Sequence, residues 1–165
     1  MAVFGDDLTD LIETQTVGCL NQDEANPVGN LFKEGAFLQS APDVDEQLLI
    51  CVRFRAPVKL SGIGFAGNSG DETGPQEIKL FQNKPDIGFA DAEDEKPAEE
   101  LTLTPEEVDV GVVKPVRFVK FQNVSSLQIF VHSNFGADVT KIERLVIRGQ
   151  PAQAMDMANW KPVKG

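Results

Sequence analysis

Residues 116–149 constrain the fold more than any other stretch, because they hold the densest β-strand pattern in the sequence. Leu127, Ile129 and Val131 recur at every second position, which is the period of a strand whose two faces meet different surroundings. Residues that favour turns interrupt this pattern twice. We therefore predict three strands joined by two turn-rich loops, which form the spine of a sheet-built domain.

The same alternation predicts earlier strands at residues 47–56, 59–67 and 77–82. Pro57 should end the first of them, because proline cannot donate a hydrogen bond to a neighbouring strand. Eight apolar residues are expected on the inward faces of these strands: Leu48, Ile50, Val52, Phe54, Ile63, Phe65, Ile78 and Leu80.

The segments between these strands have other patterns. Residues 6–16 have the spacing of a helix of one or two turns, and residues 91–100, of which six in ten are acidic, indicate a solvated loop. Residues 104–107, Thr-Pro-Glu-Glu, have the pattern of a capped helical turn. Periodicity is weak over residues 17–45, where we expect an irregular segment that covers the core. Its expected anchors are Leu20, Val28, Leu31, Phe32 and Phe37.

Seven or eight short strands lie too close together in the sequence for crossover helices, which favours antiparallel sheets. Sheets that are apolar on one face pack as a sandwich, and we predict an all-β jelly roll. An OB-like or up-and-down barrel stays open, because the pattern does not give the order of the strands. We expect one domain over residues 1–149 and a C-terminal tail over residues 150–165.

The chain of 165 residues has 26 acidic and 15 basic residues, which gives a formal charge of -11. This charge repels phosphate backbones and anionic lipids at long range, so neither nucleic acid nor a membrane is expected as a partner. The sequence begins without the basic region and apolar run of a signal peptide, and it has no run of about 18 apolar residues. We expect a soluble, intracellular monomer.

Few residues have catalytic potential. Cys19 and Cys51 are far apart and have no second cysteine nearby, which favours two buried thiols, while a disulfide between them stays open. His132, the single histidine, is interpreted as a packed or rim residue and not as the base of a nucleophile. Asp71 and Glu72 lack the ligand spacing of an EF-hand, which favours a solvated turn over a Ca²⁺ site. We predict no catalytic residue, no cofactor and no metal site.

Five sequence blocks, taken in order, resemble the PITH domain, which is named after a proteasome-interacting thioredoxin-like protein. The blocks are VGCLNQ (17–22), DEQLLICVRFRAPVKLSGIGFAG (45–67), EIKLFQN (77–83), RFVKFQNVSSLQIFVHSNFG (117–136) and VTKIERLVIRG (139–149). The resemblance implies a β-sandwich of the galactose-binding-like, jelly-roll type. In some members of the family this domain follows a thioredoxin domain. The chain has no Cys-x-x-Cys motif, so the redox activity of those members is not implied.

The resemblance also implies a non-enzymatic protein-interaction module in the cytoplasm and also in the nucleus, with the proteasome regulatory particle as the leading partner. An acidic segment can raise the rate of association with a basic partner, and a tryptophan can anchor an interface. The residues predicted to contact a partner are Asp91, Glu93, Asp94, Glu95, Phe135 and Trp160. A small-ligand or glycan-binding jelly roll is the alternative function, although the chain has no tyrosine to stack on a sugar.

Overall fold

The computed structural model describes residues 5–152. The strands are β1 (Asp6–Asp7), β2 (Gly18–Leu20), β3 (Leu38–Gln39), β4 (Leu48–Ala66), β5 (Pro75–Gln82), β6 (Glu99–Thr102), β7 (Val113–Pro115), β8 (Val124–Asn134), β9 (Lys141–Ile142) and β10 (Arg144–Pro151). The α-helices are α1 (Phe89–Asp94) and α2 (Pro105–Val110), and the 3-10 helices are η1 (Thr9–Leu11), η2 (Thr14–Thr16), η3 (Val28–Phe32) and η4 (Phe118–Lys120). Within residues 5–152, no helix is long and apolar enough to cross a membrane.

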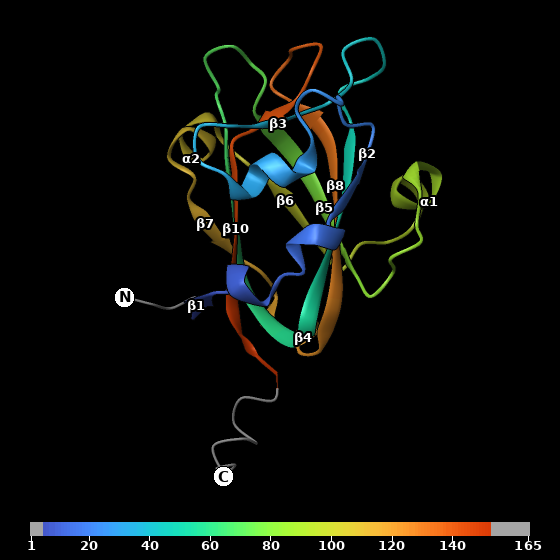
Figure 1. Cartoon of the computed structure of the whole chain (residues 1–165), viewed down its shortest axis with the longest axis vertical. Coiled ribbons are helices and arrows are strands. Elements are labelled where there is room, and N and C mark those ends of the chain that lie inside the picture. The colour runs from blue at the N-terminus through green and yellow to red at the C-terminus, as the bar shows by residue number, and fades with distance from the viewer. Residues whose placement is uncertain (1–4, 153–165) are drawn as a thin grey trace, which may run out of the picture.

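Two antiparallel layers form a β-sandwich, and β4 belongs to both of them. One layer has the order β2-β4-β8-β5-β6, and the other has the order β1-β10-β4-β7. Figure 1 shows β2 and β8 on one side of the molecule and β7 and β10 on the other, with β4 passing between the layers at the lower end. The antiparallel β-sandwich predicted from the sequence is therefore confirmed.

β4 is a single strand of 19 residues, whereas the sequence predicted two strands separated at Pro57. The pairing of β4 with β8 shifts register between Arg53 and Val58, and Pro57 lies inside this interval. Proline is tolerated where the hydrogen-bond ladder is interrupted, because no partner there requires its missing N–H. The prediction that Pro57 ends the strand is wrong, and the interval instead lies where β4 leaves one layer for the other (Figure 1).

The main core lies between the two layers. All eight side chains predicted to face inward are buried, and Leu48, Ile50 and Val52 have no exposed surface. Strand alternation alone was sufficient to predict them. In the covering segment, Val28 and Leu31 are buried as predicted. Leu20 is 48% exposed, so it is not an anchor, because it lies on the short edge strand β2.

The capped helical turn at residues 104–107 is confirmed and begins α2. The Thr104 hydroxyl accepts a hydrogen bond from the Glu107 N–H (3.2 Å), and the Glu107 carboxylate accepts one from the Thr104 N–H (3.0 Å). This reciprocal pair satisfies two backbone donors that the first turn of a helix leaves free. Residues 6–16 contain the 3-10 turns η1 and η2, which hold Leu8 and Ile12 in the core.

Two further predictions of local structure need correction. Residues 91–100 were predicted as one loop, but only residues 95–98 are irregular, because α1 ends at Asp94 and β6 begins at Glu99. Residues 116–122 were predicted as the first strand of the spine, but they contain the turn η4. The last strand continues to Pro151, two residues beyond the predicted end of the domain.

Candidate interaction surfaces

Helix α1 covers the outer face of the layer that contains β8. Ala92 is fully buried, and half-buried Phe89 packs edge-on against Phe130, with their ring centroids 6.0 Å apart. Together with Leu49 and Phe81 these residues form a second, smaller apolar cluster outside the sandwich. The acidic segment is therefore attached to the sheet through its apolar side chains.

Three of the four predicted acidic contact residues have partners within the chain. The Asp91 carboxylate accepts a hydrogen bond from the Gly88 N–H (3.2 Å), and Glu95 forms an ion pair with Lys84 (2.7 Å). Glu93 accepts a hydrogen bond from the side-chain amide of Gln47 (3.2 Å). Asp94 is exposed and makes no hydrogen bond or ion pair within the described part of the chain. Much of the negative charge of α1 is thus used to fix the helix.

His132 helps to hold α1 on the sheet. Its Nε2 atom lies 3.3 Å from the Glu93 carboxylate on α1, and its Nδ1 atom lies 3.4 Å from the Glu77 carboxylate on β5. The ring also packs edge-on against Phe130, with 5.5 Å between centroids. With its side chain 37% exposed and one ring contact to Phe130, His132 lies at the rim of the sheet, which agrees with its interpretation as a packed or rim residue.

The two cysteines lie on opposite faces of the sheet. Cys19 is paired with Ile50 and packs on the main core, and burial raises the pKa of its thiol to about 12. Cys51 is paired with Gln128 on β8, and its sulfur accepts a hydrogen bond from the Gln128 amide (3.3 Å). Both thiols are free, and this placement brings neither a disulfide nor a Cys–His pair together.

The remaining predicted contact residues do not join the acidic ones. Phe135 is half-buried and packs against the main core, so most of its ring is unavailable to a partner. Trp160 lies outside the described residues.

Asp71, weighed above as a Ca²⁺ ligand, lies in a turn. Its carboxylate accepts two hydrogen bonds from Thr73, from the N–H (3.1 Å) and the hydroxyl (2.6 Å), and these bonds lower the pKa of its carboxyl group.

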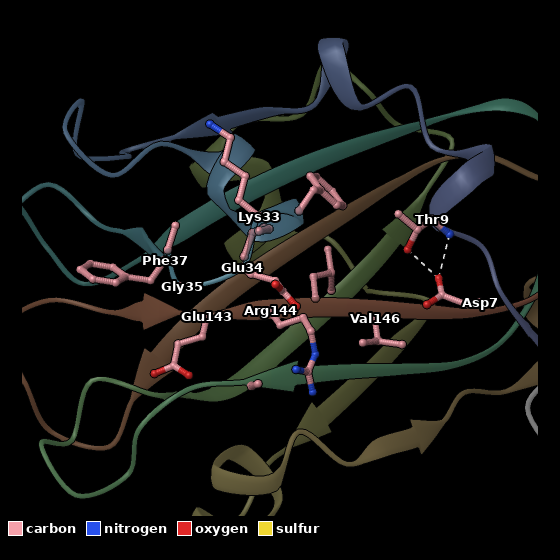
Figure 2. Close-up of a pocket in the computed structure, with 14 residues that line it drawn as sticks. Asp7, Thr9, Lys33, Glu34, Gly35, Phe37, Glu143, Arg144 and Val146 are labelled. Carbon is pink, nitrogen blue, oxygen red and sulfur yellow. Dashed lines mark hydrogen bonds between the residues drawn. The ribbon is translucent and has the colours of Figure 1, made fainter.

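A groove of about 680 Å³, not foreseen from the sequence, opens beside β10 (Figure 2). On this side β9 pairs with β3 through Lys141 and Ile142, and β10 pairs with β1 through Arg148 and Gly149. Between these two pairings, residues 143–146 have no strand on this side within the described part of the chain, while β4 pairs with residues 144–146 on the other side. The groove occupies this gap.

Backbone groups of β10 face the gap. The Ile147 carbonyl accepts a hydrogen bond from the Leu8 N–H (2.8 Å) at one end of the gap, so at Ile147 the backbone faces this side. Leu145, two residues earlier, faces the same side because backbone direction alternates along an antiparallel strand. An open strand edge of this kind can accept hydrogen bonds from, and donate them to, another chain.

The walls of the groove combine apolar and charged side chains. Figure 2 shows Phe37, Lys33 and Glu34 along one wall and Arg144 on β10, while Asp7 lies at one end. Thr9 donates to the Asp7 carboxylate from its N–H (2.9 Å) and its hydroxyl (2.5 Å), which fixes that end. The side chains of Lys33 and Arg144 make no ion pair within the described residues, so both cations are available to a partner.

The sequence carries only a weak signal for this groove. The groove depends on two very short strands, β1 on β10 and β3 on β9, which lie at its two ends. Such pairing between distant segments is not visible in local periodicity.

The family model for the PITH domain matches residues 4–165. The chain belongs to the PITH domain family. Thioredoxin-like protein 1 of Schizosaccharomyces pombe is 39% identical over 146 residues, which is 85% of this chain and 50% of that protein. PITH domain-containing protein 1 of Homo sapiens is 32% identical over 146 residues, which is 84% of this chain and 67% of that protein. The chain therefore spans half the length of the first of these relatives.

Two similar solved structures are family 32 carbohydrate-binding modules. The family 32 module of NanJ from Clostridium perfringens, in complex with galactose, has a TM-score of 0.60 and 14% identity, and the match covers 83% of this chain and 97% of that one. CpGH89CBM32-5 of the same organism has a TM-score of 0.62 and 10% identity, with 87% and 100% covered. At these identities the likeness shows the fold alone, and it confirms the galactose-binding-like jelly roll for this PITH domain.

Proposed function

We propose that this PITH domain is a non-enzymatic protein-interaction module whose partner is the proteasome regulatory particle, in the cytoplasm and the nucleus. The open edge of β10 at residues 144–146 carries the proposal, because the backbone of Leu145 faces the groove beside apolar and charged side chains, which suits a peptide segment. Family membership supports a role shared with larger proteins, in which the domain is one part of the chain.

The groove suits a short segment of a partner protein. β1 pairs with β10 at one end of the gap, and β3 pairs with β9 just before its other end, so a long added strand would collide with them. A bound segment therefore enters the gap at a loop or a chain end and places a few residues against β10. Phe32 and Phe37 offer apolar contacts, and Lys33 and Arg144 offer charged ones.

Co-elution of the purified chain with purified regulatory particle tests this function. Ala36 lines the groove, so the Ala36→Trp variant fills it with an indole ring and should abolish co-elution. Asp94 was predicted from the sequence to contact a partner, but it does not line the groove, so Asp94→Asn is the matched control and should co-elute like the unmodified chain. Failure of the unmodified chain to co-elute with intact particle would mean that the proteasome regulatory particle is not its partner.

Binding of a small molecule is the second candidate function, and the size of the groove favours it. A cavity of about 680 Å³ lies within the usual range for sites that bind small ligands, roughly 300–1,000 Å³. A thermal-shift screen with galactose and N-acetylgalactosamine is a direct test. A rise in Tm that Ala36→Trp removes would support this function over protein binding.

A further inference from the structure

The turn η4 exposes two apolar side chains between two cations. Val119 is 81% exposed and Phe118 is 43% exposed, while Arg117 and Lys120 on either side of them are also exposed. Adjacent exposed apolar side chains that are rimmed by charged residues are a feature of interaction sites.

The turn is held in place at both ends, so its exposure is a feature of the fold. Val116 is 8% exposed and Phe121 is fully buried, and these two residues enclose the turn. The Phe121 carbonyl accepts a hydrogen bond from the Leu60 N–H on β4 (2.9 Å). The Arg117 N–H donates to the Glu99 carboxylate on β6 (2.8 Å). A preformed turn loses little conformational entropy when it binds a partner.

Lys120, the last residue of η4, meets two lysines from other segments. Lys84, Lys96 and Lys120 line a depression of about 420 Å³ whose apolar lining includes Phe81 and Pro97. The side-chain amide of Gln82 donates to the Lys120 carbonyl, which ties the turn to β5. This local excess of positive charge stands out in a chain with a formal charge of -11.

Two of these lysines are available to a partner. Lys84 forms an ion pair with Glu95 (2.7 Å). Lys96 and Lys120 make no side-chain ion pair within the described residues. Arg117 lies at the long distance of 3.9 Å from the Glu99 carboxylate, with its side chain 66% exposed. Cations without close partners give a surface that complements carboxylates.

We propose that η4 and the lysine-lined depression form a second interaction surface, which binds an acidic segment of a partner protein with an apolar anchor residue. The apolar anchor packs on Phe118 and Val119, and the carboxylates face Lys96 and Lys120. A short segment meets only these local cations. A membrane or a nucleic acid presents a broad anionic surface that would also meet the acidic residues around them.

Fluorescence anisotropy with defined peptides tests this surface and does not depend on the proteasome proposal. The probe is a labelled ten-residue peptide with four glutamates around a central leucine, beside one with lysines in their place and one with glycine in place of the leucine. The acidic peptide with leucine should bind at least about tenfold more tightly than either control, and its Kd should rise with salt.

Two charge-reversed variants locate the site. K96E/K120E should weaken binding of the acidic peptide by at least about tenfold. K33E/R144E makes the same change in net charge at the β10 groove and should leave the Kd within about twofold of the unmodified chain. Val119→Ser should also weaken binding, because it removes an apolar contact while leaving every charge.

Three results would overturn the proposal. One is no binding of the acidic peptide at millimolar concentration, and another is equal weakening by the two charge-reversed variants. The third is binding of phosphatidylserine vesicles that K96E/K120E abolishes while peptide binding is unchanged.

Discussion

Helix α1 and the turn η4 are both short, charged segments on the surface of the sandwich, but they use their apolar side chains in opposite ways. α1 buries Ala92 and half of Phe89 against the sheet, and its carboxylates mostly contact residues of the same chain. η4 exposes Phe118 and Val119. A high density of charge in the sequence therefore does not by itself identify a free surface, because intramolecular partners can use that charge.

The largest expected effect is a difference in stability loss between two Phe→Ala variants, one at Phe130 beneath α1 and one at Phe118 on η4. Phe130 has no exposed surface and contacts both Phe89 and His132, so Phe130→Ala should lower the free energy of unfolding by about 3–5 kcal/mol. Phe118→Ala should lower it by less than about 1 kcal/mol, because much of that ring is already in water. Urea unfolding of both variants measures this. Equal losses would contradict the contrast.

The next effect tests whether α1 is attached through Ala92. Ala92→Asp places a carboxylate in an apolar contact and should cost at least about 2 kcal/mol of stability. Ala90→Asp adds the same charge to the exposed face of the same helix and should change stability by less than about 0.5 kcal/mol. Thermal unfolding compares the two, and similar Tm values would mean that α1 is not docked in solution.

A smaller effect concerns how stability depends on pH, which should differ between a carboxylate with hydrogen-bond partners and one without them. Hydrogen bonds from the Thr104 N–H and from Lys114 hold the pKa of the Glu107 carboxyl group below its usual value of 4.5. Because the folded pKa is the lower one, the stabilisation is present above pH 4.5 and is lost as the pH falls through the folded pKa. Glu107→Gln should therefore lose less stability than the unmodified chain between pH 5 and pH 3.

Asp94→Asn serves as the control for this pH effect, because Asp94 makes no hydrogen bond or ion pair within residues 5–152. Its stability should fall with pH in parallel with that of the unmodified chain. Urea midpoints at each pH measure the difference. Parallel curves for all three proteins would show that the Thr104 cap makes no contribution that depends on charge.

The smallest expected change in stability is that of a substitution on η4. Val119→Ser should change the free energy of unfolding by no more than about 0.5 kcal/mol, because the side chain is 81% exposed. The variant should therefore be a folded reagent for the binding assays. A loss above about 1 kcal/mol would mean that Val119 packs on the domain in solution.

Features that depend on neighbouring residues could be predicted from the sequence. The Thr104–Glu107 cap follows from four consecutive residues, and the buried face of β4 follows from alternation. Features that depend on distant partners could not. Pro57 is accommodated because β8 shifts register beside it, and η4 replaces a strand because Phe121 is buried and bonded to β4.

In the candidate sites, too, features set by neighbouring residues could be predicted and features set by distant partners could not. The acidic residues near position 93 were visible as a run of charge, but their partners His132 and Lys84 come from other segments. Phe89 and Ala92 have the three-residue spacing of a helix face, which the high density of charge obscured. The groove beside β10 results from where β1 and β3 end, and no local pattern encodes it.

Site-specific photo-crosslinking tests the central claim most directly, namely that the open stretch of β10 contacts a protein partner. A photoreactive benzophenone side chain would be placed at Glu34 on the rim of the groove and, in a second protein, at Asp94 on α1. Each protein would then be irradiated with purified proteasome regulatory particle. The account predicts a specific crosslinked subunit from position 34 and none from position 94. Crosslinks from position 94 alone, or from neither position, would contradict it.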